Sequence, residues 1–173
     1  MRLGQHFLAD SNLLEAIVRD AELGGDEVLL EVGGGEGALS RELAPRVRRL
    51  HVVEVDEGLR EPLGVVAAEH LNVELHFGDA MRIDLAGLDP PPTAMVSNLP
   101  YSIATPLLLR TIAELPGLER WTVMVQREIG DRLRAAPGGS DYGAPSVLVQ
   151  LACRVRVLRT IDYEVSVPPP SVA

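Results

Sequence analysis

The sequence predicts an α/β protein in which a mostly parallel β-sheet carries helices on both faces. Two observations predict this class. Short apolar runs alternate along the chain with longer stretches of helical periodicity, and the ends of several apolar runs carry glycines or polar side chains. Strands that alternate with helices form a parallel sheet, because each helix carries the chain back to the end of the sheet at which the previous strand began. The 173 residues suffice for one domain with a sizeable core.

Five apolar runs are too short for helices and are predicted as buried strands. They cover 27–32 (EVLLEV), 50–55 (LHVVEV), 73–77 (VELHF), 93–98 (TAMVSN) and 120–126 (RWTVMVQ). The stretches beside them predict helices within 10–23, 33–47, 57–71, 105–115 and 127–136. The first helix has cap candidates at Asp10 and Ser11, followed by apolar residues at helical spacing. Pro106 falls near the first turn of the fourth helix, where proline is tolerated.

The C-terminal part of the sequence is less regular. Residues 137–146 (PGGSDYGAPS) are predicted as a loop from their composition. Residues 147–161 are rich in β-branched side chains, and we expect one or two helical turns followed by a strand. The closing segment 165–173 (VSVPPPSVA) is typical of a linker or a domain edge.

The composition narrows the classes of function. The single cysteine, Cys153, cannot form an internal disulfide, and no Cys/His cluster has metal-ligand spacing, so we expect a reducing cytoplasm and no metal. No apolar run approaches the roughly 18 residues of a membrane span, and the N-terminus lacks the long apolar region of a secretory signal. The net charge of −9 opposes nucleic-acid binding, but it is uneven. Residues 1–90 hold 8 Arg against 18 acidic residues, whereas residues 91–173 hold 8 Arg against 7.

Glycines and a carboxylate follow the first two predicted strands. Gly33, Gly35 and Ala38 match the dinucleotide pattern G-x-G-x-x-G/A, and Gly37 adds a further glycine to this turn. Glu54 lies 17 residues after Gly37, near the roughly 20-residue spacing at which an acidic side chain binds ribose hydroxyls. Glycine-rich turns also serve packing, and strand-end acids are often merely solvated. The two features together favour a ligand of the adenosine type.

The third and fourth predicted strands also end in residues suited to a base. Asp79 could accept a hydrogen bond from an adenine amino group, or it could cap a helix. The stretch Asn98, Leu99, Pro100 and Tyr101 (NLPY) could be a turn. It also suits an amine clamp, in which an amide oxygen and a backbone carbonyl accept the N–H bonds of an exocyclic amine. Proline would then fix the backbone, and the tyrosine ring would stack on a flipped base.

Seven motifs together resemble the ribosomal RNA adenine N6-dimethyltransferases. They are GQHFL (4–8), EVGGGEG (31–37), VVEVDEGL (52–59), GDAM (78–81), NLPYSIATPLL (98–108), VMVQREIGDRL (123–133) and DYGAPSVLVQ (141–150). The last three resemble the small-subunit enzyme more than the large-subunit antibiotic-resistance branch. The resemblance implies a Rossmann-like class I fold with a mostly parallel seven-strand sheet. It also implies S-adenosylmethionine as the cofactor, S-adenosylhomocysteine as the product, and no metal.

The resemblance assigns residues to the cofactor and to the target adenine. The residues expected at the cofactor are Gln5, His6, Leu8, Gly33, Gly35, Gly37, Glu54, Asp79, Ala80 and Asn98. The residues expected to hold and stack the target base are Asn98, Leu99, Pro100 and Tyr101. The family usually has proline at the position of Gly34, and we expect cofactor binding to survive this departure.

The resemblance further implies that residues 1–173 form the catalytic domain, without the family's small helical C-terminal domain that helps to grip RNA. The expected partner is small-subunit ribosomal RNA or an assembling small subunit, bound by a monomer. A strip of arginines could contact phosphates or could be an ordinary surface: Arg127, Arg132, Arg134, Arg154, Arg156 and Arg159. Three alternatives remain open at this point: a methyltransferase acting on DNA adenine or protein glutamine, a nicotinamide oxidoreductase, and a non-catalytic subunit-assembly factor.

Overall fold

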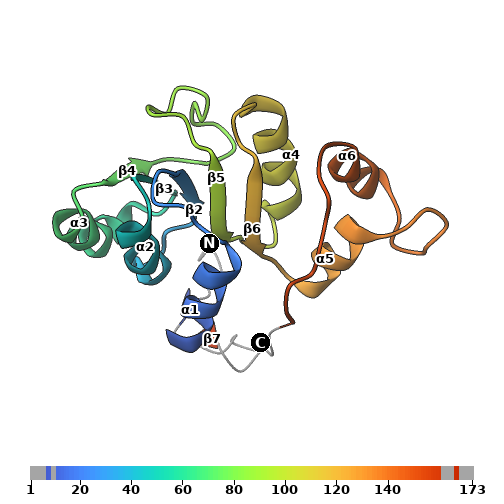
Figure 1. Ribbon diagram of the computed structural model, residues 1–173, viewed down its shortest axis with the longest axis horizontal. Helices are drawn as coiled ribbons and strands as arrows, with labels where there is room; N and C mark the ends of the chain where they lie inside the picture. Colours follow the sequence, from blue (N-terminus) through green and yellow to red (C-terminus); the bar gives the residue numbers. More distant parts are fainter. Residues whose placement is uncertain (1–6, 9–10, 161–165, 168–173) are drawn as a thin grey trace.

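A five-stranded parallel sheet forms the centre of the protein (Figure 1). The computed structural model describes residues 7–8, 11–160 and 166–167. The sheet has the order β4-β3-β2-β5-β6, and its strands are β2 (Val28–Val32), β3 (Arg49–Glu54), β4 (Val73–Phe77), β5 (Ala94–Asn98) and β6 (Arg120–Met124). A separate antiparallel pair joins β1 (Phe7–Leu8) to β7 (Ser166–Val167). The five strands expected from the apolar runs are therefore confirmed.

Six α-helices flank this sheet in the described residues. They are α1 (Ser11–Asp20), α2 (Ala38–Leu43), α3 (Arg60–Glu69), α4 (Ala104–Glu114), α5 (Arg127–Arg134) and α6 (Ala144–Ala152). Two short 3₁₀ turns, η1 (Ala44–Arg46) and η2 (Glu57–Leu59), follow α2 and precede α3. The five predicted helices are confirmed, and α6 begins inside the segment that we expected to be a loop.

The strand expected near the end of 147–161 is wrong for the described residues, because 153–160 have no regular structure. Alternating arginine and valine favours a strand, but a strand also needs a partner, and this segment pairs with none of the described strands. Val157 and Leu158 remain half exposed. The seven-strand sheet is likewise not confirmed: the described strands divide into a sheet of five and a sheet of two.

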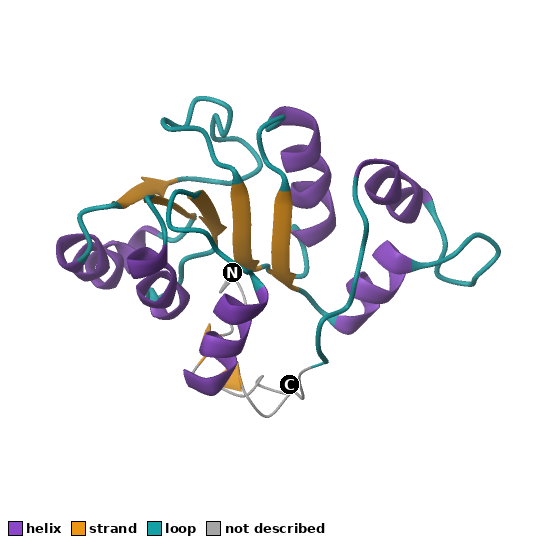
Figure 2. Ribbon diagram, in the orientation of Figure 1, coloured by secondary structure: helices purple, strands orange, loops and turns teal. Residues whose placement is uncertain are grey.

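Successive residues of each strand place their side chains alternately into two hydrophobic cores, one on each face of the sheet. Leu29 and Val96 belong to the core beneath α1, α2 and α3, whereas Leu30 and Met95 belong to the core beneath α4, α5 and α6. This alternation follows from the two-residue period of a β-strand. Figures 1 and 2 show the two groups of helices on either side of the sheet, so the fold has three layers.

The order of connections creates a switch point between β2 and β5. The chain runs outward from β2 to β3 and β4, returns to β5 on the other side of β2, and continues to β6. Parallel pairing of β2 with β5 is limited to Leu29 with Ala94 and Leu30 with Met95. Beyond it, the Val32 N–H donates to the Ser97 hydroxyl at 2.9 Å. A crevice at the carboxyl ends of such strands is where open parallel sheets bind ligands.

Candidate functional site

The glycine-rich loop leaves β2 at the switch point. The N–H of Gly33 donates to the carbonyl oxygen of Val53 at 2.8 Å, which ties the loop to β3. Gly37 has a φ of 83°, and a Cβ there would lie 2.5 Å from Cγ2 of Val66. Both the left-handed backbone and the close approach to α3 therefore require glycine at position 37. Gly37 thus serves packing, the alternative noted for glycine-rich turns, and its expected contact with a cofactor stays a prediction.

Gly34 is the position at which the sequence departs from the resembled family. A Cβ at this residue would lie 2.5 Å from Cγ1 of Val52 and 3.2 Å from Cδ2 of Leu63. Val52 is buried and stiff at χ1, so it cannot easily withdraw. The departure thus has a packing reason: in this chain the loop lies against β3 too closely for any side chain.

Glu54, the last residue of β3, joins the loop through its side chain. One carboxylate oxygen, Oε2, accepts the N–H of Gly35 at 3.0 Å, and the other, Oε1, accepts the N–H of Asp56 at 2.9 Å. The residue is only 3% exposed. Each oxygen has a second lone pair, so the carboxylate can accept further hydrogen bonds while holding the loop.

Asp79 lies two residues after β4 and starts a tight turn. Its Oδ1 accepts the N–H of Met81 at 2.8 Å, and its backbone carbonyl accepts the N–H groups of Arg82 and Ile83. Asp79 thus stabilises a turn and caps no helix, because the described residues between β4 and β5 contain no helix. The N–H of Gly78 donates to the backbone carbonyl of Glu54 at 2.8 Å, which places this turn beside the end of β3.

Arg110 also holds this turn, although no pattern in the sequence singled it out. From α4 its guanidinium donates to the carbonyl oxygens of Ala80 at 2.5 Å and Ile83 at 2.8 Å. Its Nε donates to Glu114 at 2.9 Å. A planar guanidinium can make such parallel contacts in one fixed geometry, so Arg110 positions the backbone of Ala80.

Asn98 ends β5, and its backbone carbonyl lies next to Gly33: a Cβ on that glycine would be 3.6 Å from the oxygen. Leu99 is buried, and its N–H donates to the carbonyl of Met124 at 3.0 Å. The carbonyl of Pro100 accepts the N–H groups that begin α4, at Ile103 and Ala104. Tyr101 is 54% exposed. The backbone of this stretch is thus fixed, while the tyrosine ring faces solvent.

The fold therefore brings together the glycine loop, Glu54, the Asp79 turn and the 98–101 stretch at the carboxyl ends of the parallel strands. Gln5 and His6 lie outside the described residues. Leu8 belongs to β1, which is paired with β7, and only its backbone is described. The expected contacts of these three residues with a cofactor stay predictions.

Glu31 is a buried carboxyl group that sequence reasoning missed. It lies within β2, is 1% exposed, and accepts a hydrogen bond from the Ser40 hydroxyl at 2.6 Å. Burial raises the pKa of Glu31 to about 8, the Ser40 hydrogen bond opposes this rise, and the charge of Glu54 adds to it. Glu31 is the first residue of the EVGGGEG motif, but the motif does not reveal that its side chain is buried.

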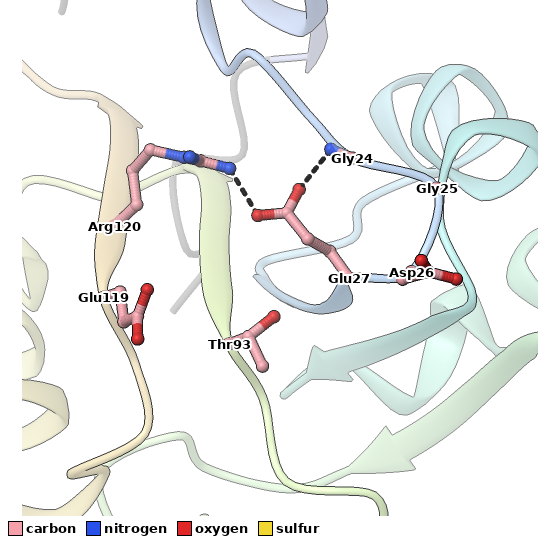
Figure 3. Close-up of a pocket in the computed structure, with 7 residues that line it drawn as sticks. All are labelled: Gly24, Gly25, Asp26, Glu27, Thr93, Glu119 and Arg120. Carbon is pink, nitrogen blue, oxygen red and sulfur yellow. Dashed lines mark hydrogen bonds and ion pairs between the residues drawn. The ribbon is translucent and has the colours of Figure 1, made fainter.

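A pocket of about 330 Å³ lies at the opposite end of the strands, beside the amino ends of β2, β5 and β6 (Figure 3). It is lined by Gly24, Gly25, Asp26, Glu27, Thr93, Glu119 and Arg120. The carboxylate of Glu27 pairs with Arg120 and accepts the N–H of Gly24, as the dashed lines in Figure 3 show. These polar groups bind one another, and they lie away from the residues expected to bind a ligand.

The arginine strip is partly neutralised by neighbouring carboxylates. Asp131 pairs with Arg134 at 2.7 Å and with Arg127 at 3.7 Å, and Asp20 pairs with Arg159. The others, Arg132, Arg154 and Arg156, are exposed and have no ion-pair partner among the described residues. The strip runs from α5 to the segment 153–160. No helix in the described part of the chain is long and apolar enough to cross a membrane.

Sequence comparison matches the chain to one family model and to a curated relative. All 173 residues match a family model described as ribosomal RNA adenine dimethylase. Ribosomal RNA small subunit methyltransferase A of Rubrobacter xylanophilus is 44% identical over 171 residues, which cover 99% of this chain and 64% of that protein. The chain thus spans less than two thirds of that relative's length.

Two solved structures share the fold. A dimethyladenosine transferase from Plasmodium falciparum superposes with a TM-score of 0.86 and 26% identity, over 96% of this chain and 60% of that one. The 23S rRNA methyltransferase ErmE superposes with a TM-score of 0.64 and 34% identity, over 73% of this chain and 50% of that one. With the parallel sheet, these neighbours confirm the expected class I methyltransferase fold.

Proposed function

The chain belongs to the ribosomal RNA adenine dimethylase family, and from this premise we propose that residues 1–173 form a catalytic methyltransferase domain. It transfers methyl groups from S-adenosylmethionine to the N6 amine of adenines in small-subunit ribosomal RNA, in the cytoplasm and as a monomer. The observation that carries this proposal is the meeting of the glycine loop, Glu54 and Asn98 at the switch point. Neither a nicotinamide enzyme nor a simple turn accounts for the NLPY stretch at that place.

The residues at the carboxyl ends of the strands fit S-adenosylmethionine. Gly33 has no side chain to fill the space beside the Asn98 carbonyl, so the methionine part of the cofactor can approach the loop backbone. Glu54 retains lone pairs for the two ribose hydroxyls. Asp79 and the backbone of Ala80, which Arg110 holds, would bind the adenine ring. When bound, the cofactor supplies an electrophilic methyl group on a positively charged sulfur.

The chain's own residues position the target amine. The Asn98 side-chain oxygen and the Leu99 carbonyl accept its two N–H bonds, which favours the tetrahedral form whose lone pair can attack. The half-exposed Tyr101 offers a face on which the flipped base stacks. An amine held in this way would accept the methyl group that the bound cofactor supplies, and it would then release its proton to water. Positioning and electrostatics supply the catalysis, without a metal at the transferred group.

The test combines binding and transfer. The chain should bind S-adenosylmethionine and not NADH in calorimetric titration. It should incorporate labelled methyl groups into adenines of unmethylated small subunits or their RNA. Methyl incorporation into DNA or protein instead would replace the proposed substrate. Cofactor binding without transfer to any of them would support a non-catalytic assembly factor.

Asn98→Ala tests the amine clamp. We expect a loss of about 100-fold in turnover, typical of removing one preorganised polar contact, with little change in cofactor affinity. Glu15→Ala, at an exposed position of α1, is the control and should leave both quantities unchanged. Equal losses of turnover and cofactor affinity in Asn98→Ala would contradict the clamp.

A further inference from the structure

Two histidines and a glutamate meet where β3 pairs with the edge strand β4. His51 lies in β3, and Glu74 and His76 lie in β4, where His51 is the register partner of Glu74. Glu74 and His76 are two residues apart in one strand, so their side chains share a face. The nearest ligand atoms of the three residues all lie within 4.8 Å of one another. The two histidines are 25 positions apart in the sequence, so no spacing rule reveals this cluster.

The surroundings of His51 fix which nitrogen is available. The ring is fully buried, and its Nε2 lies 2.9 Å from the carbonyl oxygen of Pro90. A carbonyl oxygen can only accept, so Nε2 carries the proton and Nδ1 presents a lone pair. That Nδ1 lies 3.0 Å from Nε2 of His76. Histidines that bind metals usually donate their other N–H to a carbonyl or carboxylate in this way.

The distances suit a small divalent cation. Nδ1 of His51 lies 3.8 Å from Oε2 of Glu74, and Nε2 of His76 lies 3.9 Å from Oε1 of Glu74. Tetrahedral zinc with bonds of about 2.0–2.1 Å separates its ligand atoms by about 3.3 Å. The two distances to Glu74 end on different oxygens of its carboxylate, and single ligand atoms from the three residues lie within 4.8 Å of one another. The imidazole nitrogens need to separate by a few tenths of an ångström, and the half-exposed Glu74 carboxylate needs to turn inward by about 1–1.5 Å.

We propose that His51, Glu74 and His76 bind Zn²⁺, with water as the fourth ligand. Two histidines, one glutamate and one water form a ligand set that zinc accepts. Without the ion, Nε2–H of His76 donates to Nδ1 of His51. Zn²⁺ takes the place of that proton, which leaves Nε2 for solvent while Nδ1 of His76 takes one up, so the ring stays neutral and Nε2 presents its lone pair to the ion. Arg49, 3.9 Å from Glu74, is a weak surface competitor that the ion displaces.

The ion would have a structural role. β4 is the edge strand of the sheet, and a bound ion would link it to β3. The Asp79 turn begins three residues after His76, so the link would steady the turn without taking part in methyl transfer. This inference stands independently of the substrate.

Zinc titration of the untagged chain tests the site, with Glu74→Gln and His76→Gln as variants. We expect about one Zn²⁺ per chain, and a loss of at least 10-fold in affinity in each variant. Zn²⁺ should also raise the unfolding midpoint of the parent chain. His70→Gln, at the C-terminal end of α3 and outside the cluster, is the matched control and should behave like the parent.

Co²⁺ provides a second readout, because a tetrahedral nitrogen and oxygen site gives it an intense visible spectrum that surface binding does not. Absence of Zn²⁺ binding, or equal affinity in the parent and the His76→Gln chain, would overturn the proposal. A weak octahedral Co²⁺ spectrum would also do so, as it indicates adventitious binding. Glu74 is partly exposed, so Glu74→Gln remains informative should His76→Gln fold poorly.

Discussion

Glu31 should make the stability of the folded chain depend on pH in an unusual direction. The folded chain keeps the Glu31 proton up to a pKa of about 8, whereas the unfolded chain releases it near the ordinary value of 4.5. Between these values the folded state binds more protons than the unfolded state. The free energy of unfolding from this group is therefore highest at low pH, falls as the pH rises through this window, and levels off above it.

The size of the effect follows from the same two values. Their difference of about 3.5 pH units corresponds to at most about 5 kcal/mol. Glu31→Gln removes the titration while keeping the shape of the protonated side chain. The variant should gain stability relative to the parent as the pH rises, by up to that amount. A constant offset of about 1–3 kcal/mol is expected if the new amide group lacks a partner.

Urea unfolding at several pH values between about 5 and 9 measures the difference. The informative quantity is the free energy of the variant minus that of the parent at each pH, since other titrating groups cancel in it. Glu36→Gln, which removes an exposed carboxylate from the same loop, controls for the loss of a charge and should follow the parent profile. Parallel profiles for the parent and Glu31→Gln would refute the reasoning.

Three further substitutions test the candidate site. Gly37→Ala should cost about 2–4 kcal/mol in urea unfolding, and a double-mutant cycle with Val66→Ala should recover about 1 kcal/mol of it; zero coupling would exclude the proposed clash. Arg110→Met should weaken S-adenosylmethionine binding about 10-fold, as expected for a supporting contact, whereas Arg134→Met should not; equal affinities in titration would contradict the positioning role. Arg154→Ala should lower the slope of RNA affinity against salt by about one, and an unchanged slope would remove it from the phosphate contacts.

Much of the fold, and the place of the candidate site in it, follow from local sequence pattern. The strands were identified because a buried parallel strand is a short apolar run, and the glycine loop and Asn98 because ligand residues gather where such strands end. Both inferences use neighbours along the chain. Residues 153–160 show the limit of the method, since alternation cannot reveal whether a partner strand exists.

The features that were missed depend on tertiary packing. Arg110 lies on a helix, and only the folded chain places it against the turn that follows β4. Glu31 occupies an apolar strand, but its partner Ser40 comes from the next helix. The pairing of His51 with His76 depends on the register of two neighbouring strands. Residues of this kind acquire their function from contacts that no periodicity encodes.

The pairing of β1 with β7 has a consequence for the order in which the chain folds. The strands β2, β3 and β4 follow one another in sequence, so their contacts form by closing short loops. Joining Leu8 to Ser166 closes a loop of roughly 160 residues, whose entropy cost grows with the logarithm of its length to about 4–5 kcal/mol. The two residue pairs between β1 and β7 offset little of this entropy cost on their own. The central sheet must therefore form first and bring β1 and β7 near each other. The ends therefore join last, and they are the first part expected to separate while the sheet remains intact.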